Sequence, residues 1–284
     1  AASDVYKRQE MGFAPLLGHD EIDRLIIAPH DLEFEPATAR SAISARKVHS
    51  AAGSTPVLSS ENLSGHPFYG GRQSATLARR LHSVAPEARI VITVRSQETM
   101  LPSVYMQYLQ RGGTLTYKAF FNGSDGLGYP GFELGHFCYN RLIALYQSLF
   151  STVHVMTDEA LSSEPNQILS GLANALDHPV PELSKTSTRR VSASLPQAVA
   201  PVLRRVNQTR ISTLNPAPAL ALSREPGWMY RGLAAAARLR SVQPLLTARP
   251  LDAYVKDQLA GMFTESNRRL DEITNGRLDL SAYP

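Results

Sequence analysis

An arginine and a serine that lie eight positions apart are the residues of this chain whose types and spacing best suit chemistry. Arg95 follows the run 90–94, Ile-Val-Ile-Thr-Val, whose apolar and β-branched composition predicts a buried parallel strand. Ligands of open α/β sheets bind at the carboxyl ends of such strands. A helix is expected directly after Arg95, so the guanidinium and the Ser103 hydroxyl are predicted to converge on one phosphate. The alternative is that Arg95 pairs with a carboxylate and Ser103 is a solvated helix residue.

This pattern resembles the sulfotransferases that use 3′-phosphoadenosine-5′-phosphosulfate (PAPS), in which an arginine ending a strand and a serine eight positions later hold the 3′-phosphate. Arg95 and Ser103 match those two positions, and Tyr105 and Tyr108 match the aromatic helix that follows the serine. The resemblance covers residues 10–195 and is to a group of bacterial sulfotransferase-like proteins. It implies PAPS as the co-substrate, in-line transfer of a sulfuryl group to a hydroxyl or amine of a small-molecule or carbohydrate acceptor, and no metal.

Glu61 is the candidate general base that the resemblance suggests. The run 56–60 predicts a short strand, and Glu61 follows it at the sheet edge where Arg95 is also expected. Cytosolic sulfotransferases carry a Lys-Thr-His tripeptide at the matching position, in which the histidine deprotonates the acceptor, and other sulfotransferases use a glutamate as the base. The alternatives are that Glu61 caps the next turn or forms an ion pair, and that His66 in the following loop is the base.

A basic segment is the second candidate contact with the nucleotide. Residues 187–194 resemble the loop with which many sulfotransferases close over the nucleotide, and this likeness assigns phosphate contacts to Arg189 and Arg190. The alternative is a solvated arginine pair on the surface, which is the more usual place for adjacent arginines.

One element of the family pattern is absent. Sulfotransferases carry near their start a strand, loop and helix that read roughly Lys-[Ser/Thr]-Gly-[Ser/Thr]-Thr, and this loop holds the 5′-phosphosulfate. The nearest approach here, residues 51–55, lacks the lysine and leads into a strand. The loop would lie just upstream of Met11, so we expect the chain to be truncated there. Such a chain is predicted to bind the product nucleotide weakly and to transfer no sulfate.

Composition narrows the class of ligand. The chain has 284 residues, 43% of them hydrophobic, and its formal net charge is +4 with a sequence pI of about 9.2. This charge suits anionic ligands, whereas the lack of long Lys/Arg runs argues against nucleic acid. One cysteine, Cys138, excludes an internal disulfide, and the scattered histidines make a metal site unexpected. No apolar stretch has the length of a membrane span, so we predict a cytoplasmic protein.

The order of predicted elements favours an α/β fold, with a three-layer, P-loop-like parallel sheet and helices on both faces. Strands are predicted at 56–60, 89–95 and 152–156, and helices at 36–49, 74–84, 134–149 and from Ser162 or Ser163 to 176. Three further helices are predicted at 195–209, 227–240 and 252–273. Residues 1–195 are therefore expected to form the α/β domain, and residues 196–284 a helical extension of the same domain.

Two other functions compete with a sulfotransferase. A non-catalytic nucleotide-binding or protein-interaction module would keep the fold without the phosphosulfate loop, and the missing motif favours it. A kinase-like transferase would need a phosphate loop and a magnesium-binding carboxylate, and the sequence offers neither. The sequence specifies neither the acceptor nor an oligomeric state.

Overall fold

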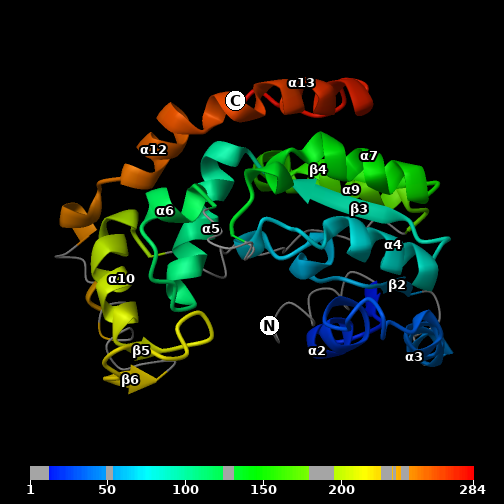
Figure 1. Cartoon of the computed structure of the whole chain (residues 1–284). Helices are drawn as coiled ribbons and strands as arrows, with labels where there is room; N and C mark the ends of the chain where they lie inside the picture. Colours follow the sequence, from blue (N-terminus) through cyan, green and yellow to red (C-terminus); the bar gives the residue numbers. More distant parts are fainter. Residues whose placement is uncertain are drawn as a thin grey trace.

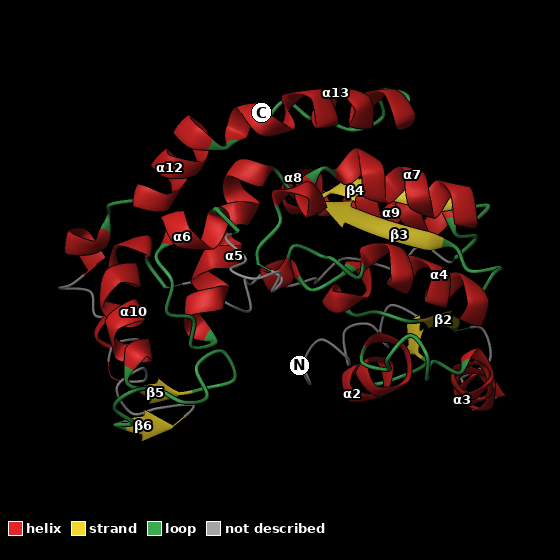
Figure 2. Ribbon diagram, viewed as in Figure 1, coloured by secondary structure: helices red, strands yellow, loops and turns green. Residues whose placement is uncertain are grey.

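Short parallel strands and surrounding helices make up the described part of the chain (Figure 1 and Figure 2). The structure is a computed structural model, and it describes residues 13–48, 54–123, 131–178, 195–224, 232, 235–237 and 243–284. The strands are β1 (Phe13–Pro15), β2 (Thr55–Val57), β3 (Ile90–Val94), β4 (Val153–Thr157), β5 (Arg210–Ile211) and β6 (Ser223–Arg224). Three parallel pairs form, β1 with β2, β3 with β4 and β5 with β6. Mixed helices and parallel strands confirm the predicted α/β character.

The strand that carries the candidate site is paired along one edge. β3 pairs with β4 over its whole length, with Val94 opposite Thr157 at the carboxyl end. Among the described residues β3 forms no ladder with β2, so a single P-loop-like sheet stays a prediction. The prediction that this strand is buried is wrong for most of its length: Ile90 and Ile92 are half-buried, Val91 (39% exposed) and Thr93 are exposed, and only Val94 is buried. The predicted strands at 89–95 and 152–156 are confirmed, whereas the one at 56–60 is shorter and shifted to Thr55–Val57.

The starts of β2 and β3 meet at one helix end. The helix α9 (Pro165–Ala175) is followed by Asp177 and His178. Asp177 forms an ion pair of 2.9 Å with Arg89, just before β3, and the Nδ1 atom of His178 lies 2.6 Å from the Thr55 hydroxyl oxygen in β2. The two strands therefore begin at the same place, and their carboxyl ends both lead away from it.

Most predicted helices of the first half are confirmed, with two changes. The helices α3 (Pro36–Val48) and α4 (Ser74–Val84) match their predictions. The predicted helix 134–149 is divided into η5 (Leu134–Phe137) and α7 (Tyr139–Leu149), because Cys138 leaves the helical region at ψ 76°. Ser162 and Ser163 cap no helix start, since they end α8 (Asp158–Ser163). The remaining elements here are α2 (His19–Ile22), η1 (Asp23–Ile27), η2 (Glu61–Ser64), η3 (Pro67–Tyr69), α5 (Gln97–Gln110) and α6 (Tyr117–Phe121).

The C-terminal part is helical, as predicted, but its last helix is broken. The predicted helix 195–209 is η6 (Gln197–Val199) with α10 (Ala200–Gln208), and most of 227–240 lies outside the described residues. The predicted helix 252–273 is divided into α12 (Pro250–Gln258), η8 (Ala260–Phe263) and α13 (Thr264–Ile273). Gly261, a poor helix former, lies in the dividing turn. The turn η7 (Gln243–Leu246) precedes α12.

Two apolar clusters form the core, and β3 contacts both. One cluster joins α5 to the C-terminal helices, for example through Tyr105, Leu251 and Phe263. The other lies in the N-terminal half, where α4 and α7 pack together. Ile92 in β3 is packed against both clusters, and Val94 belongs to the first. Figure 1 shows α12 and α13 running along the side of the molecule that α5 and α7 face. The strand bearing Arg95 thus sits between the two packed halves.

A buried arginine holds the N-terminal segment on α4. Arg80 is 6% exposed, and its guanidinium donates hydrogen bonds of 2.6, 3.2 and 2.6 Å to the carbonyl oxygens of Ile26, Ile27 and Pro29. These carbonyls lie at the end of the π-helical turn η1 and just after it, where the helix leaves them without internal partners. Arg80 also pairs with Asp31 at 2.7 Å. One side chain therefore satisfies the open backbone acceptors of a whole turn.

Candidate functional site

Arg95 stands at the carboxyl end of β3, immediately before α5, as the sequence predicts. The helix starts at this point because the Ser96 carbonyl accepts hydrogen bonds from the Thr99 and Met100 amides, at 3.0 and 2.8 Å. The hydroxyl of Thr99 donates to the same carbonyl at 3.0 Å. Arg95 and Ser96 are thus the two residues that join the end of β3 to the start of α5, and we call them the Arg95 corner.

Local contacts fix the guanidinium of Arg95. Its Nε–H donates to the Thr99 hydroxyl oxygen at 2.9 Å, and the carboxylate of Asp158 lies 3.7 Å from Nε. The Nη groups have no hydrogen-bond partner among the described residues, and the side chain is 39% exposed. Because an arginine presents parallel N–H bonds along each edge of its fork, the outer Nη edge is free to bind an anion.

Ser103 lies on the same helix but makes no hydrogen bond with Arg95 among the described residues. It is half-buried and stands six positions after Gln97, which corresponds to about 9 Å along the helix axis. The pairing of Arg95 with a carboxylate, the alternative considered above, does occur through Asp158. Convergence of Arg95 and Ser103 on one phosphate stays a prediction.

Two acidic residues beside Arg95 were not identified from the sequence. Asp158 and Glu159 begin α8 directly after β4, and Glu159 accepts a hydrogen bond of 2.9 Å from the Ser96 amide. An acidic side chain there stabilises the positive end of α5. The signal in the sequence was their position, because β4 was predicted as a strand parallel to β3 and its carboxyl end must lie near Arg95.

Glu61 is an exposed carboxylate at the start of η2, four residues after β2. It does not cap this turn, since the Ser60 hydroxyl accepts the hydrogen bond from the Asn62 amide. Glu61 forms no ion pair or side-chain hydrogen bond with the described residues. Its carboxylate is therefore available to a ligand.

The geometry of His66 favours a hydrogen-bond donor over a base. The Nδ1 atom accepts a hydrogen bond of 3.2 Å from the Phe68 amide, so the proton of the neutral ring belongs on Nε2. Burial lowers the pKa of His66, Glu61 acts in the opposite direction, and the nearby Arg111 lowers it further. The ring is accordingly neutral at pH 7 and offers Nε2–H. Of the two candidate bases, Glu61 is the one with a free proton-accepting atom, because His66 Nδ1 is already occupied.

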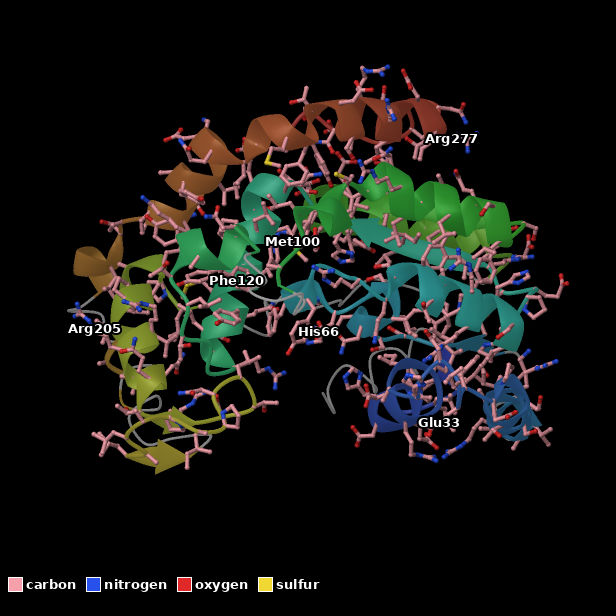
Figure 3. The ribbon with its side chains drawn as sticks, viewed as in Figure 1. Glu33, His66, Met100, Phe120, Arg205 and Arg277 are labelled. Atoms are coloured by element: carbon pink, nitrogen blue, oxygen red, sulfur yellow. The ribbon has the colours of Figure 1, made fainter. Side chains whose placement is uncertain are left out.

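The Glu61 and His66 region and Arg95 lie toward opposite ends of α5. The ring of Phe68 is 6.0 Å from that of Tyr108, which stands eleven positions after Gln97 (97 to 108). Eleven residues correspond to about 16 Å of helix, so these residues cannot share one phosphate. Figure 3 labels His66 in the loop beside α5 and Met100 in an early turn of the helix. A ligand contacting both regions must be elongated.

The predicted nucleotide contacts Arg189 and Arg190 lie outside the described residues, in the range 179–194. Among the residues that are described, no group of three or more His, Cys, Asp or Glu side chains could hold a metal ion. Within the same residues, none of the helices combines the length and apolar character needed to cross a bilayer.

Comparisons of the chain with models of protein families, with curated proteins and with solved structures give no match. No family membership follows for this chain from those comparisons.

Proposed function

We propose that the chain is a PAPS-dependent sulfotransferase and that Arg95 anchors the 3′-phosphate of the nucleotide. The observation that carries this proposal is the free Nη edge of Arg95 at the carboxyl end of a parallel strand. A bidentate contact with a phosphate needs such an edge, and the position is where α/β sheets bind ligands. When bound, PAPS supplies the sulfuryl group that is transferred to a hydroxyl or amine.

The remaining residues receive roles that suit their chemistry. Glu61, whose exposed carboxylate forms no ion pair or hydrogen bond with the described residues, removes the acceptor proton. His66 donates its Nε2–H to an oxygen of the acceptor molecule. Ser103 lies on α5 between Arg95 and the Glu61 and His66 region. A nucleotide substituted at both its 3′ and 5′ positions, together with an acceptor, is long enough to contact both ends of α5.

A non-catalytic nucleotide-binding or protein-interaction module is the second candidate. Two carboxylates favour an interaction module, because Asp158 lies beside Arg95 and Glu159 already accepts a hydrogen bond from the Ser96 amide just before α5. These groups complement the positive charge of the corner in the absence of a ligand. A sulfate-transfer assay with PAPS and a panel of hydroxyl and amine acceptors separates the enzyme from the module only in a protein that carries the phosphosulfate loop, because no transfer is expected without it.

Nucleotide binding tests the proposal directly. We expect adenosine 3′,5′-bisphosphate to bind at least about 10-fold more tightly than adenosine 5′-monophosphate, because only the former has the 3′-phosphate that Arg95 would hold. Isothermal titration calorimetry of the chain with each compound measures the ratio. Equal affinities, or no binding of either compound, would contradict a 3′-phosphate anchor at Arg95.

The titration of His66 tests the Glu61 and His66 arrangement independently of any ligand. Glu61→Gln is expected to lower the pKa of His66 further, because it removes the negative charge that favours the imidazolium. Arg111→Gln is expected to raise the pKa, since it removes a positive charge that disfavours the imidazolium. NMR titration of the ring measures both shifts, with Glu87→Gln as a distant control. Shifts of the same sign in the two variants would refute the arrangement.

A further inference from the structure

The C-terminal segment 278–284 lies against the carboxyl ends of β3 and β4. The Ser96 hydroxyl donates to the Ala282 carbonyl at 2.7 Å, and the Tyr283 hydroxyl donates to Glu159 Oε2 at 3.1 Å. The Asn267 amide in α13 donates to the Pro284 carbonyl at 2.8 Å. The segment therefore contacts the residues on both sides of the Arg95 corner.

A buried pair of amides attaches α13 to the first residue of α5. Gln97 is completely buried and donates hydrogen bonds to Asn267 Oδ1 at 2.9 Å and to the Phe137 carbonyl at 3.0 Å. Asn267 returns a hydrogen bond of 3.2 Å to Gln97 Oε1. Because unpaired amides are costly in the interior, this reciprocal pair favours one position of α13 relative to α5.

Glu159 connects the C-terminal segment to the partners of Arg95. One carboxylate oxygen accepts from the Ser96 amide and the other accepts from Tyr283. With both oxygens held, the start of α8 is fixed, and this includes Asp158, which lies beside the guanidinium. Burial and, to a lesser degree, the Glu159 charge raise the pKa of Tyr283, so its hydroxyl remains a proton donor at neutral pH.

The backbone of Arg95 is held as well. Its carbonyl accepts a hydrogen bond of 2.8 Å from the Tyr139 hydroxyl. Burial raises the pKa of Tyr139, which keeps this hydroxyl protonated. The residue after Arg95 is fixed through its amide by Glu159 and through its hydroxyl by Ala282. The guanidinium therefore projects from a backbone with few remaining degrees of freedom.

We propose that the segment 278–284 positions Arg95 for anion binding, acting through Ser96 and Glu159. This inference rests on the proposed function of Arg95. A guanidinium that is already oriented loses less conformational entropy when a phosphate binds, so affinity depends on the groups that hold it. Tyr283 and Ser96 are positioning residues, because neither supplies the Nη edge.

Apolar contacts and polar contacts of the segment are separable. Leu278, Leu280 and the Tyr283 ring pack against the apolar cluster that joins α5 to the C-terminal helices. This apolar burial stabilises the position of the segment. The hydroxyls of Tyr283 and Ser96 instead orient Glu159 and the backbone beside Arg95, through their hydrogen bonds. Tyr283→Phe and Ser96→Ala each remove a hydroxyl and keep the packing, which makes them suitable tests.

The experiment measures hydrogen exchange and nucleotide affinity in these two variants. We expect faster exchange of the backbone amide at position 96 and an affinity for adenosine 3′,5′-bisphosphate lowered about 3- to 10-fold, the usual effect of one hydrogen bond, with little change in Tm. Ser148→Ala is the control, because its hydroxyl donates to the Leu145 carbonyl at 2.7 Å near the end of α7, about 13 Å along the helix from Tyr139. The control should leave both measurements unchanged.

Each outcome decides the inference. Unchanged exchange and affinity in both variants would show that the segment only packs against the core. A fall in affinity that merely follows a large fall in Tm would assign it a structural role and overturn the proposal. If the wild-type chain binds no nucleotide, the proposed function fails and the affinity prediction fails with it. The exchange of Ser96 then still shows whether the segment holds the corner.

Discussion

Arg95→Ala is expected to lower the affinity for adenosine 3′,5′-bisphosphate by about 100-fold. The estimate corresponds to about 3 kcal/mol, the loss of two hydrogen bonds between a guanidinium edge and a phosphate. Arg95→Lys should fall between wild type and alanine, because lysine keeps the charge and loses the planar fork. Isothermal titration calorimetry at one fixed salt concentration measures the three affinities.

Arg89→Ala is the matched control for Arg95. Arg89 stands just before the start of β3, pairs with Asp177, and is exposed to a similar degree as Arg95. It removes the same positive charge from the chain at the opposite end of the strand. If both alanine variants lost affinity equally, the effect would be one of net charge, and Arg95 would have no specific contact with the phosphate.

Arg80→Met is expected to lower the free energy of unfolding by about 3 kcal/mol or more, because three backbone carbonyls near η1 lose their hydrogen-bond donor. The ion pair with Asp31 adds little, since the Asp31 side chain is 67% exposed. For a chain of this size the change corresponds to a Tm lowered by roughly 6 to 12 °C. Chemical and thermal denaturation measure the two quantities.

Arg79→Met serves as the control for this prediction, because Arg79 is the exposed neighbour of Arg80 on the same helix. It should remain within about 0.5 kcal/mol of wild type, as is usual for surface substitutions. A stability loss of less than 1 kcal/mol in Arg80→Met would mean that water replaces the guanidinium at these carbonyls at little cost.

Local signals in the sequence were sufficient to predict β3, α4 and the placement of Arg95. A continuous β-branched run and a helical apolar stripe each act over fewer than about 15 residues, so their structure follows from nearby chemistry. The broken helix near Gly261 was missed because the apolar period continues through the break. The separate hydrogen bonding of β2 and β3 depends on contacts between distant segments, which no local pattern encodes.

In the candidate site, too, contacts between residues close in the sequence could be predicted, and contacts between distant residues could not. Arg95 and Thr99 are close in sequence, and their contact follows from a strand that ends at a helix. Asp158 and Glu159 lie more than 60 positions later, and they reach Arg95 and Ser96 respectively only because β4 pairs with β3 in register. The tautomer of His66 is set by one amide in the short helix η3, and the sequence carries no signal for it.

The bond between Ser96 and Ala282 spans 186 positions, and this separation has a consequence for synthesis of the chain. Ribosomes release a nascent protein from its amino end at about 5–20 residues per second, and early parts can fold while later parts are still being made. The N-terminal cluster, which ends near Val153, can therefore pack early. The corner around Arg95 cannot be completed until residues 282–284 have left the ribosome. While residues 97–281 are being made, the nascent chain thus carries β3 without the support that orients its arginine.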